Sequence, residues 1–371
     1  MGLFGEQAAR SGYRLLVRSI GTADARIIPS LRRLRPTTDS ELAGLLYRAP
    51  SELLSGLNQE AGAKLRDILR ETGVEVDLVP ASEDYEPGTG DYEVAVVIQR
   101  FDRMLSIIEA TMGILGADVA TAKRLVCASP AVVIGRVSAA TVDALRRRFQ
   151  PLGVELDVSR TRDAVFDIAA DTQDETTAAA LAGLLTAANA PRVESGTGQF
   201  MATGLDAAAA ERLWSEVSRT AAKVRVLNRD FLRFDVRLER APRSKEMADY
   251  LVEVTGMKAA TAERALGRTP FVLAENVPGA RMVELLNGVG ARGGAASGIL
   301  LALRAFGLSL KPGGDRQAAR VWVDSIGGRE AAAVFDRAST SELPGPFTKT
   351  QARWLQHELR NHGIASQLVE R

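Results

Sequence analysis

Two histidines and one cysteine are the side chains best suited to acid–base, metal or nucleophile chemistry in this sequence. His357 and His362 lie close together near its end, but no cysteine or carboxylate cluster around them completes a metal-ligand spacing. Cys127 stands in an apolar run of helical type and has no second cysteine with which to form an intramolecular disulfide. We therefore predict structural or solvated roles for both histidines, and no metal site, cofactor or catalytic residue.

The stretch Gly288–Gly294 (GVGARGG) is the nearest match in the sequence to a phosphate-binding loop. The repeat described below places it in the turn after a helix, where carbonyl groups face outward and an anion would find few N–H donors. No P-loop follows a predicted strand, and neither G-x-S-x-G nor HExxH occurs. These patterns predict a protein that is not an enzyme.

Charge is almost balanced, because 47 Lys and Arg face 46 Asp and Glu, and the formal net charge is +1. This balance does not favour nucleic acid or an anionic membrane as a global partner. Residues 1–36 depart from it with seven arginines against Glu6 and Asp24: Arg10, Arg14, Arg18, Arg26, Arg32, Arg33 and Arg35. Three interpretations stay open for this segment: a solvated surface, a site for an acidic protein, or an RNA site. The RNA site is the least favoured because stacking aromatic residues are missing.

An apolar stripe has the spacing of one helix face and includes Met104, Ile107, Ile108, Thr111 and Met112. The spacing predicts a helix and leaves two uses open. The stripe either packs into a core or lines a hydrophobic groove for a partner.

The elements that would position these residues recur along the chain. The segments that begin at Ser51 and Ser341 align without a gap, and in each a glycine, Gly73 or Gly363, precedes a final apolar strand. Pro130 stands before Gly153 at the same spacing that separates Pro50 from Gly73. Whole modules therefore recur, and not single helices alone.

Residues 92–158 show the order of elements most clearly. Alternating apolar residues predict a strand from Tyr92, and two helices follow, with a break at Gly116 and a cap at Asp118. A short strand at 132–134, a third helix from a Ser138 cap and a strand at 154–158 complete the unit. The order predicts an α+β fold in which a helical layer covers a small, mainly antiparallel sheet.

Five such modules are predicted, at residues 12–80, 91–159, 163–230, 232–310 and 317–371. Their first strands are expected near Tyr13, Tyr92, Ala164, Phe234 and Ala319, partly because Arg18–Gly21 after the first strand is echoed by Asp324–Gly327. The second helix is expected to be degraded in the third module, and a helix is expected to be missing from the fifth. Residues 80–90 (PASEDYEPGTG) are predicted to be a flexible linker.

Three of the modules resemble the C-terminal domain of the bacterial ribosomal stalk protein, whose fold is shared by the Clp protease adaptor. The family pattern has a V-I-K-x-V-R helix, a T-G-L-G-L-K-E-A-K-x-L-V turn and helix, and then A-P. Residues 21–50, 101–130 and 241–270 cover its first part without a gap. The matching positions include Ile27, Ile28, Arg32 and Ala49–Pro50 in the first module, Ile107, Ile108, Gly116, Ala122, Lys123 and Pro130 in the second, and Thr255–Gly256, Ala262 and Pro270 in the fourth.

In the stalk family the basic first and second helices recruit translational GTPases, so the resemblance implies a partner surface on these helices. The lysine of V-I-K is replaced here by Pro29, Glu109 and Asp249, whereas Arg32 and Lys123 keep basic positions. The predicted partner-binding residues are Ile27, Ile28, Arg32 and Arg33 in the first module, and Met104, Ile107, Ile108 and Lys123 in the second.

Together these patterns predict a non-catalytic scaffold or adaptor that holds other proteins through several related modules. The alternative is a ribosome- or translational-GTPase-associated factor with a stalk-like recruiting surface. We expect a cytoplasmic protein without membrane insertion, because no signal peptide is recognisable and no apolar segment reaches about 18 residues.

Overall fold

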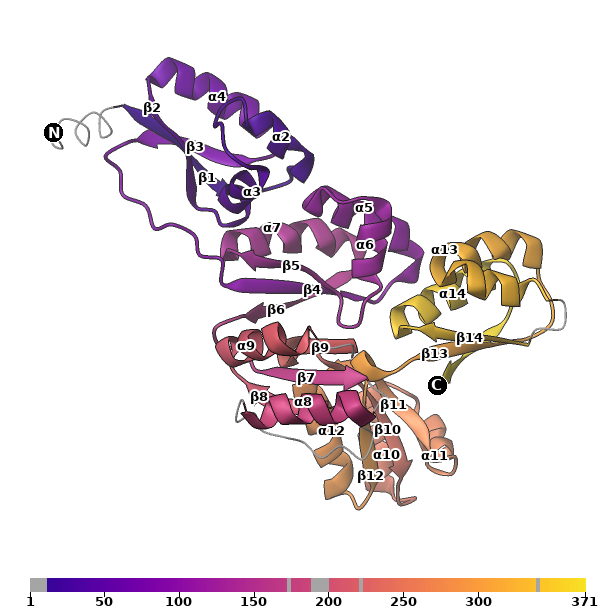
Figure 1. The fold of residues 1–371 in the computed structure, drawn as a ribbon. Helices are drawn as coiled ribbons and strands as arrows, with labels where there is room; N and C mark the ends of the chain where they lie inside the picture. The colour runs from indigo at the N-terminus through magenta and orange to yellow at the C-terminus, as the bar shows by residue number, and fades with distance from the viewer. Residues whose placement is uncertain (1–11, 172–174, 188–199, 220–222, 338–340) are drawn as a thin grey trace. The chain divides into compact units, whose positions relative to one another are not determined.

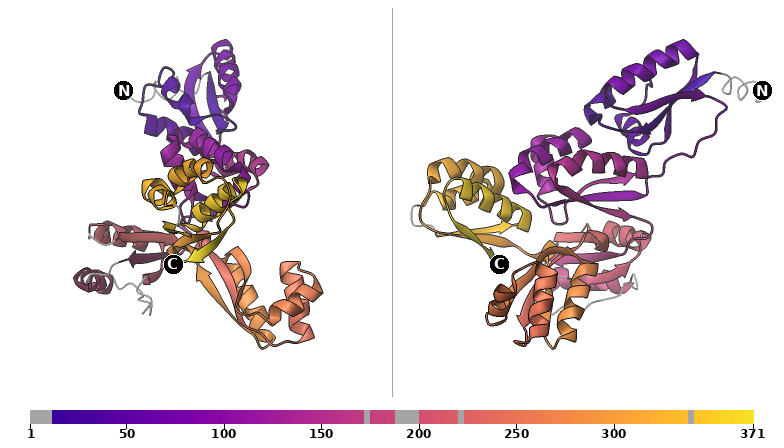
Figure 2. Two further views of the ribbon diagram at one scale, coloured as in Figure 1. Left: turned by 90° about the vertical axis from the view of Figure 1, so that its right-hand side faces the viewer. Right: turned by 180° about the vertical axis from the view of Figure 1, so that it is seen from behind.

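The computed structural model describes residues 12–171, 175–187, 200–219, 223–337 and 341–371. Over these residues the chain forms five three-stranded antiparallel sheets, each with its first strand in the centre. Helices lie on one face of each sheet, which confirms the predicted tandem array of small α+β modules (Figures 1 and 2). The chain divides into two compact units, residues 1–162 and 163–371.

The five sheets share one register. An aromatic residue near the start of each central strand pairs with the apolar residue near the end of the second strand: Tyr13 with Leu57, Tyr92 with Val137, Phe166 with Leu205, Phe234 with Val277, and Phe306 with Phe347. The next residue along caps the helix after the second strand with its side chain in four modules: Asn58, Ser138, Asp206 and Thr348. The repeat therefore extends to individual positions.

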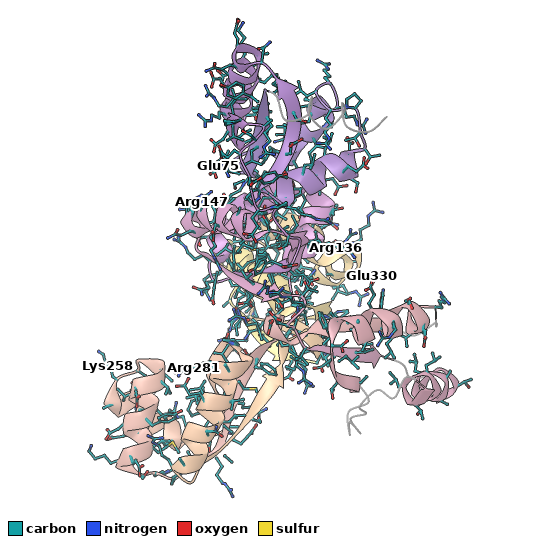
Figure 3. The ribbon with its side chains drawn as sticks, turned by 90° about the vertical axis from the view of Figure 1, so that its left-hand side faces the viewer. Glu75, Arg136, Arg147, Lys258, Arg281 and Glu330 are labelled. Carbon is teal, nitrogen blue, oxygen red and sulfur yellow. The ribbon has the colours of Figure 1, made fainter. Side chains whose placement is uncertain are left out.

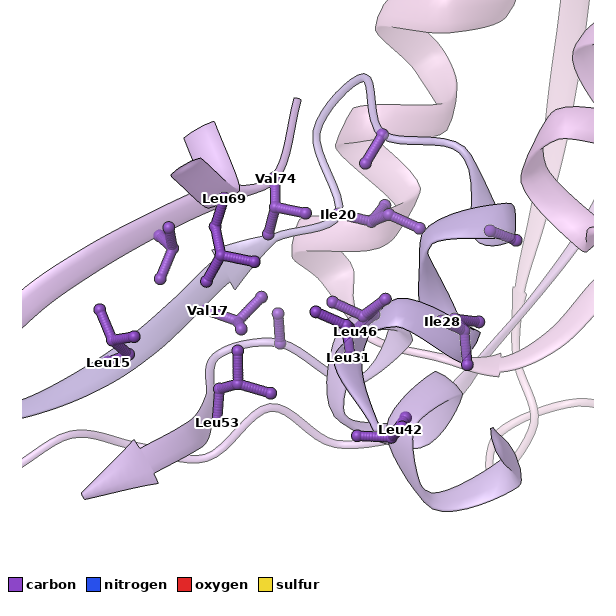
Figure 4. Close-up of a cluster of buried hydrophobic side chains, with 14 of the residues drawn as sticks. Leu15, Val17, Ile20, Ile28, Leu31, Leu42, Leu46, Leu53, Leu69 and Val74 are labelled. Atoms are coloured by element: carbon purple, nitrogen blue, oxygen red, sulfur yellow. The ribbon is translucent and has the colours of Figure 1, made fainter. Parts of the chain in front are cut away.

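Module one builds its core on one face of its sheet. Its elements are β1 (Tyr13–Ser19), η1 (Ala25–Ile27), α2 (Ile28–Leu31), α3 (Asp39–Tyr47), β2 (Ser51–Leu57), α4 (Gln59–Glu71) and β3 (Glu75–Pro80). Leu15 and Val17 of β1 pack with Leu42 and Leu46 of α3 and Leu69 of α4 (Figure 4). Burial of these apolar side chains is the main stabilising term for so small a unit.

Module two follows the predicted order of elements throughout. They are β4 (Tyr92–Ile98), η2 (Phe101–Arg103), α5 (Met104–Leu115), α6 (Val119–Val126), β5 (Val132–Val137), α7 (Ala139–Phe149), η3 (Gln150–Leu152) and β6 (Val154–Arg160). Asp118 and Ser138 cap α6 and α7 as predicted, and Gly116 ends α5 in the left-handed conformation. Local sequence signals thus specify this module well.

Module three contains β7 (Phe166–Asp171), α8 (Glu175–Ala187), β8 (Phe200–Leu205), α9 (Ala207–Val217), β9 (Lys223–Asn228) and η4 (Arg229–Phe231). The predicted degradation of its second helix falls on residues 188–199, which lie outside the described residues.

Module four contains β10 (Arg233–Arg240), α10 (Lys245–Thr255), α11 (Ala259–Leu266), β11 (Phe271–Pro278), α12 (Gly279–Ala291), β12 (Ala295–Leu300) and η5 (Leu301–Leu303). The glycine run begins inside α12 and only its end forms the turn, where Gly293 has a φ of +73°. Gly73, Gly153 and Gly363 adopt the same left-handed backbone in their modules, as glycine does at little cost.

Module five differs from the prediction in two ways. Its central strand is β13 (Phe306–Leu310). The residues near Ala319, which were expected to form that strand, belong instead to the helix α13 (Arg316–Phe335), which Asp315 caps. The expected loss of a helix is also wrong, because Gly328 interrupts α13 with non-helical angles and leaves helix on both sides. The remaining elements are β14 (Glu342–Phe347), α14 (Lys349–Asn361) and β15 (Ser366–Glu370).

Three prolines confirm the predicted alignment of the modules. Pro50, Pro130 and Pro270 each lie between a second helix and a second strand, and each follows a cis peptide bond. A Pro inside a helix would have contradicted this alignment.

Modules one and two pack against each other within the first unit. The backbone N–H of Ser138 and the hydroxyl of Thr141 both donate to the Tyr47 carbonyl, at 2.9 and 2.8 Å. Arg147 pairs with Glu75 at 2.8 Å, and both residues are labelled in Figure 3. The segment between these modules was expected to be a flexible linker, but it connects two packed modules and does not form a free tether.

No single helix in the described part of the chain is both long and apolar enough to cross a membrane. The pair Phe101–Leu115 and Val119–Val126 meets that requirement only together, and its two members are bent by 112°.

Candidate functional site

The predicted apolar stripe of module two is core. Met104, Ile107 and Ile108 are 1%, 0% and 3% exposed, so they offer no surface to a partner and the groove interpretation is wrong for them. Burial follows from the helix geometry, because this face of α5 is the one that turns toward its own module. Leu105 points the other way and is 62% exposed.

The predicted residues of module one lie in and just after η1 and α2. Ile28 is buried in the core and Ile27 packs against it half-buried, so neither is a free contact point. Arg32 is exposed and pairs with Asp39 at 2.6 Å. Arg33 is exposed as well, and in the described part of the chain its guanidinium makes no ion pair. The structure therefore leaves Arg32 and Arg33 as the accessible part of this predicted set.

Lys123 is half-buried on α6, close to Cys127. Burial raises the pKa of the Cys127 thiol to about 12, and the positive charge of Lys123 opposes this shift without cancelling it. The thiol therefore stays protonated near neutral pH, which makes it a poor nucleophile.

The two histidines lie at the end of α14, where His362 is the C-cap residue. Within the described residues no group of three His, Cys, Asp or Glu side chains could hold a metal ion.

A groove that the sequence analysis missed lies in module one, with a cavity volume of about 770 Å³. We call it the module-one groove. One wall is α3, a second is the start of the edge strand β2, and a third is the segment that leads to module two. The residues that matter for its chemistry are Arg35, Glu41, Leu45, Arg48, Tyr85 and Pro87.

Gly88 fixes the third wall of the groove. Its N–H donates to the Pro50 carbonyl at 2.8 Å, beside the start of β2. A Cβ at this position would overlap the carbonyl oxygens of Arg48 and Ala49, so the close approach requires glycine. The one sequence signal for this wall was an aromatic residue, Tyr85, inside an otherwise polar linker. Its guanidinium neighbour Arg14 lies 4.8 Å from the ring centroid.

The carboxylates of the groove are already engaged. Glu41 accepts hydrogen bonds from the Thr37 hydroxyl and from the N–H and hydroxyl of Thr38 in a capping box, and the Thr37 bond is the main cause of its lowered pKa. Glu52 lies 3.5 Å from the guanidinium of Arg14.

Over the residues that the structure describes, the hydrogen bonds of the two groove arginines go to backbone oxygen. One Nη of Arg35 donates to the carbonyls of Glu52 and Leu53 at 2.9 and 3.0 Å, and Nε of Arg48 donates to the Arg136 carbonyl at 3.4 Å. Among the described residues neither arginine forms an ion pair. Each guanidinium has five N–H donors, so both keep donors for an anionic ligand.

Modules four and five are joined by a charge cluster whose central pair, Lys349 and Asp235, is buried. Nζ of Lys349 donates to both oxygens of Asp235 at 2.6 Å and lies 3.0 Å from Glu275. Arg353 pairs with the same glutamate. Burial alone raises the pKa of Glu275, but Lys349 and Arg353 outweigh burial and hold it below its usual value. The opposite charges of these groups compensate one another, which fits a structural joint between modules.

Compared with protein-family models, with curated proteins and with solved structures, the chain gives no significant match.

Proposed function

We propose that the chain is a non-catalytic scaffold or adaptor that binds other proteins through its modules. The observation that supports this most is the strict repetition of one module in five sheets of equal register. Modules linked in one chain present several surfaces at a high effective concentration, so individually weak contacts add up to a stable complex. The module-one groove, with its two guanidinium groups and no acid–base pair, is suited to binding and not to catalysis.

A second candidate is a ribosome- or translational-GTPase-associated factor. It is favoured by Arg32 and Arg33, which are exposed beside the helix that the stalk family uses for recruitment. For either candidate we place the protein in the cytoplasm, where a single buried thiol such as Cys127 suits reducing conditions.

The test is affinity purification of the tagged full-length chain from its native cell after mild crosslinking, with quantitative mass spectrometry of the recovered proteins. The scaffold proposal expects a defined set of non-ribosomal proteins in constant ratio to the chain. The second candidate expects ribosomal proteins or a translational GTPase instead, and their loss from the double variant Arg32→Glu/Arg33→Glu. Recovery of nothing above an untagged control contradicts both.

A further inference from the structure

We infer that the module-one groove binds an extended, acidic peptide segment of another protein. This inference rests on the proposed scaffold function and names the kind of partner that one of its modules takes. The cavity volume of the groove, about 770 Å³, falls within the range of functional ligand sites.

The available charge in the groove is positive. Glu41 accepts hydrogen bonds from Thr37 and Thr38, and Glu52 is paired with Arg14. Over the described residues the hydrogen bonds of Arg35 and Arg48 go to carbonyl oxygens, and the charge of Arg35 also acts on Glu41. A carboxylate suits such a guanidinium because two parallel N–H···O bonds match its planar geometry. The walls also carry apolar surface from Leu45, Pro50 and Pro87, which fits the side chains between the acidic positions of a peptide.

The edge of β2 limits how a peptide is held. The N–H of Gly88 already donates a hydrogen bond to the Pro50 carbonyl, and Arg35 donates to the carbonyls of Glu52 and Leu53. A ligand therefore cannot extend the sheet along the first part of this strand, as in strand addition. Recognition must come from side chains, and so from the charge of the ligand.

Nucleic acid fits the same groove less well. Binding by many phosphates needs a much larger basic surface than the two arginines of the groove. The ring of Tyr85 is also occupied by Arg14 and is a poor platform for base stacking.

The experiment uses the full chain and fluorescence anisotropy. The probe is a short fluorescein-labelled peptide of glutamate and serine with one central leucine, and the matched control peptide has glutamine in place of glutamate. We expect the glutamate peptide to bind more tightly than the glutamine peptide and to lose affinity as salt is raised.

Arg48→Glu is expected to weaken the glutamate peptide about tenfold or more, because an attractive charge becomes repulsive. Gly88→Ala is expected to weaken it without any change of charge, because the third wall is displaced from β2. Arg268→Glu is the matched control, since it makes the same charge change on an exposed residue outside the groove. A thermal melt of each variant checks that the fold is retained.

Equal affinity for the two peptides overturns the inference, as does equal weakening by Arg48→Glu and Arg268→Glu. Tighter binding of a single-stranded RNA oligonucleotide that is lost in Arg48→Glu also overturns it in favour of nucleic acid. The scaffold proposal fails separately, when purification recovers no partner although the peptide binds. The groove inference fails alone when the wild-type chain recovers partners and the Arg48→Glu chain recovers all of the same partners although it no longer binds the peptide. The groove would then not be the site that holds those partners.

Discussion

Replacing Lys349 by Met is expected to loosen the joint between modules four and five. The ammonium is the main counter-charge of Asp235, and the side chains of the pair are only 11% and 10% exposed. Met fills a similar volume without charge, so the variant leaves a carboxylate buried with one remaining donor, the backbone N–H of Asn276 at 2.9 Å. The perturbation is thus the loss of charge compensation and not the creation of a cavity.

Removing one partner of a buried ion pair costs about 3–5 kcal/mol. The double variant Lys349→Met/Asp235→Asn removes both charges and keeps the hydrogen bond to Asn276, so it should recover part of that loss, with a coupling of about 0.5–3 kcal/mol. Lys245→Met is the matched control within module four. Its ammonium also pairs with a carboxylate, Asp249 at 2.7 Å, but the lysine side chain is 89% exposed, so the change should have little effect on stability.

Hydrogen exchange followed by mass spectrometry is the suitable assay, because a chain of several modules does not unfold in one two-state step. Lys349→Met should lower the protection of β10, β11 and α14, while the elements of module one keep theirs. Equal changes of protection in Lys349→Met and Lys245→Met would contradict a role for the buried pair, as would a double variant that loses as much as the sum of its two single changes.

Two further predictions concern the core of module two and the pH dependence of the joint. Ile107→Ala should destabilise module two by about 2–5 kcal/mol because its side chain is fully buried. Leu105→Ala, on the exposed side of the same helix, should change stability by less than about 0.5 kcal/mol. Hydrogen exchange of β4 and α5 compares the two variants, and equal effects would contradict the core assignment. The pKa of Glu275 is lower in the folded chain than its ordinary value of 4.5, so its contribution to stability is present above that value and is lost as the pH falls through the lower folded pKa. Thermal melts over this acid range should fall more steeply for the wild-type chain than for Glu275→Gln, and parallel curves would contradict the assignment.

Module two could be predicted closely because its signals are local. Asp118 and Ser138 cap helices at the start of clear apolar periodicity, and a strand of alternating residues precedes them. Module five lacked such signals, since its central strand, FGLSL from Phe306, is short and contains glycine. The prediction drew on the echo Asp324–Gly327 instead, and that stretch is helical because Asp315 starts a helix upstream of it.

The groove could not be predicted for a different reason. Its walls come from α3, β2 and a segment far along the chain, which contacts such as the Gly88–Pro50 hydrogen bond and the packing of Arg14 on Tyr85 hold in place. Composition alone marked residues 80–90 as a linker, and no periodicity shows where a coil segment is anchored. For Ile107 and Ile108 the apolar spacing predicted the helix face correctly, but the choice between core and groove required the burial of that face.

The connection between modules one and two also explains why a binding site would occur in one module of a repeat. The segment from β3 to β4 (residues 81–91) is longer than the connections at 161–165, 229–232 and 301–305, which join the later modules. Those shorter connections have too few residues to run back along their own module and form a wall, because each residue spans at most about 3.6 Å. The repeat therefore gives the modules equivalent cores, whereas the long connection provides the third wall of the groove, which is not part of the repeat. On this argument, shortening residues 81–91 to the length of the other connections should abolish binding of the acidic peptide and leave the core around Leu15 and Leu46 intact.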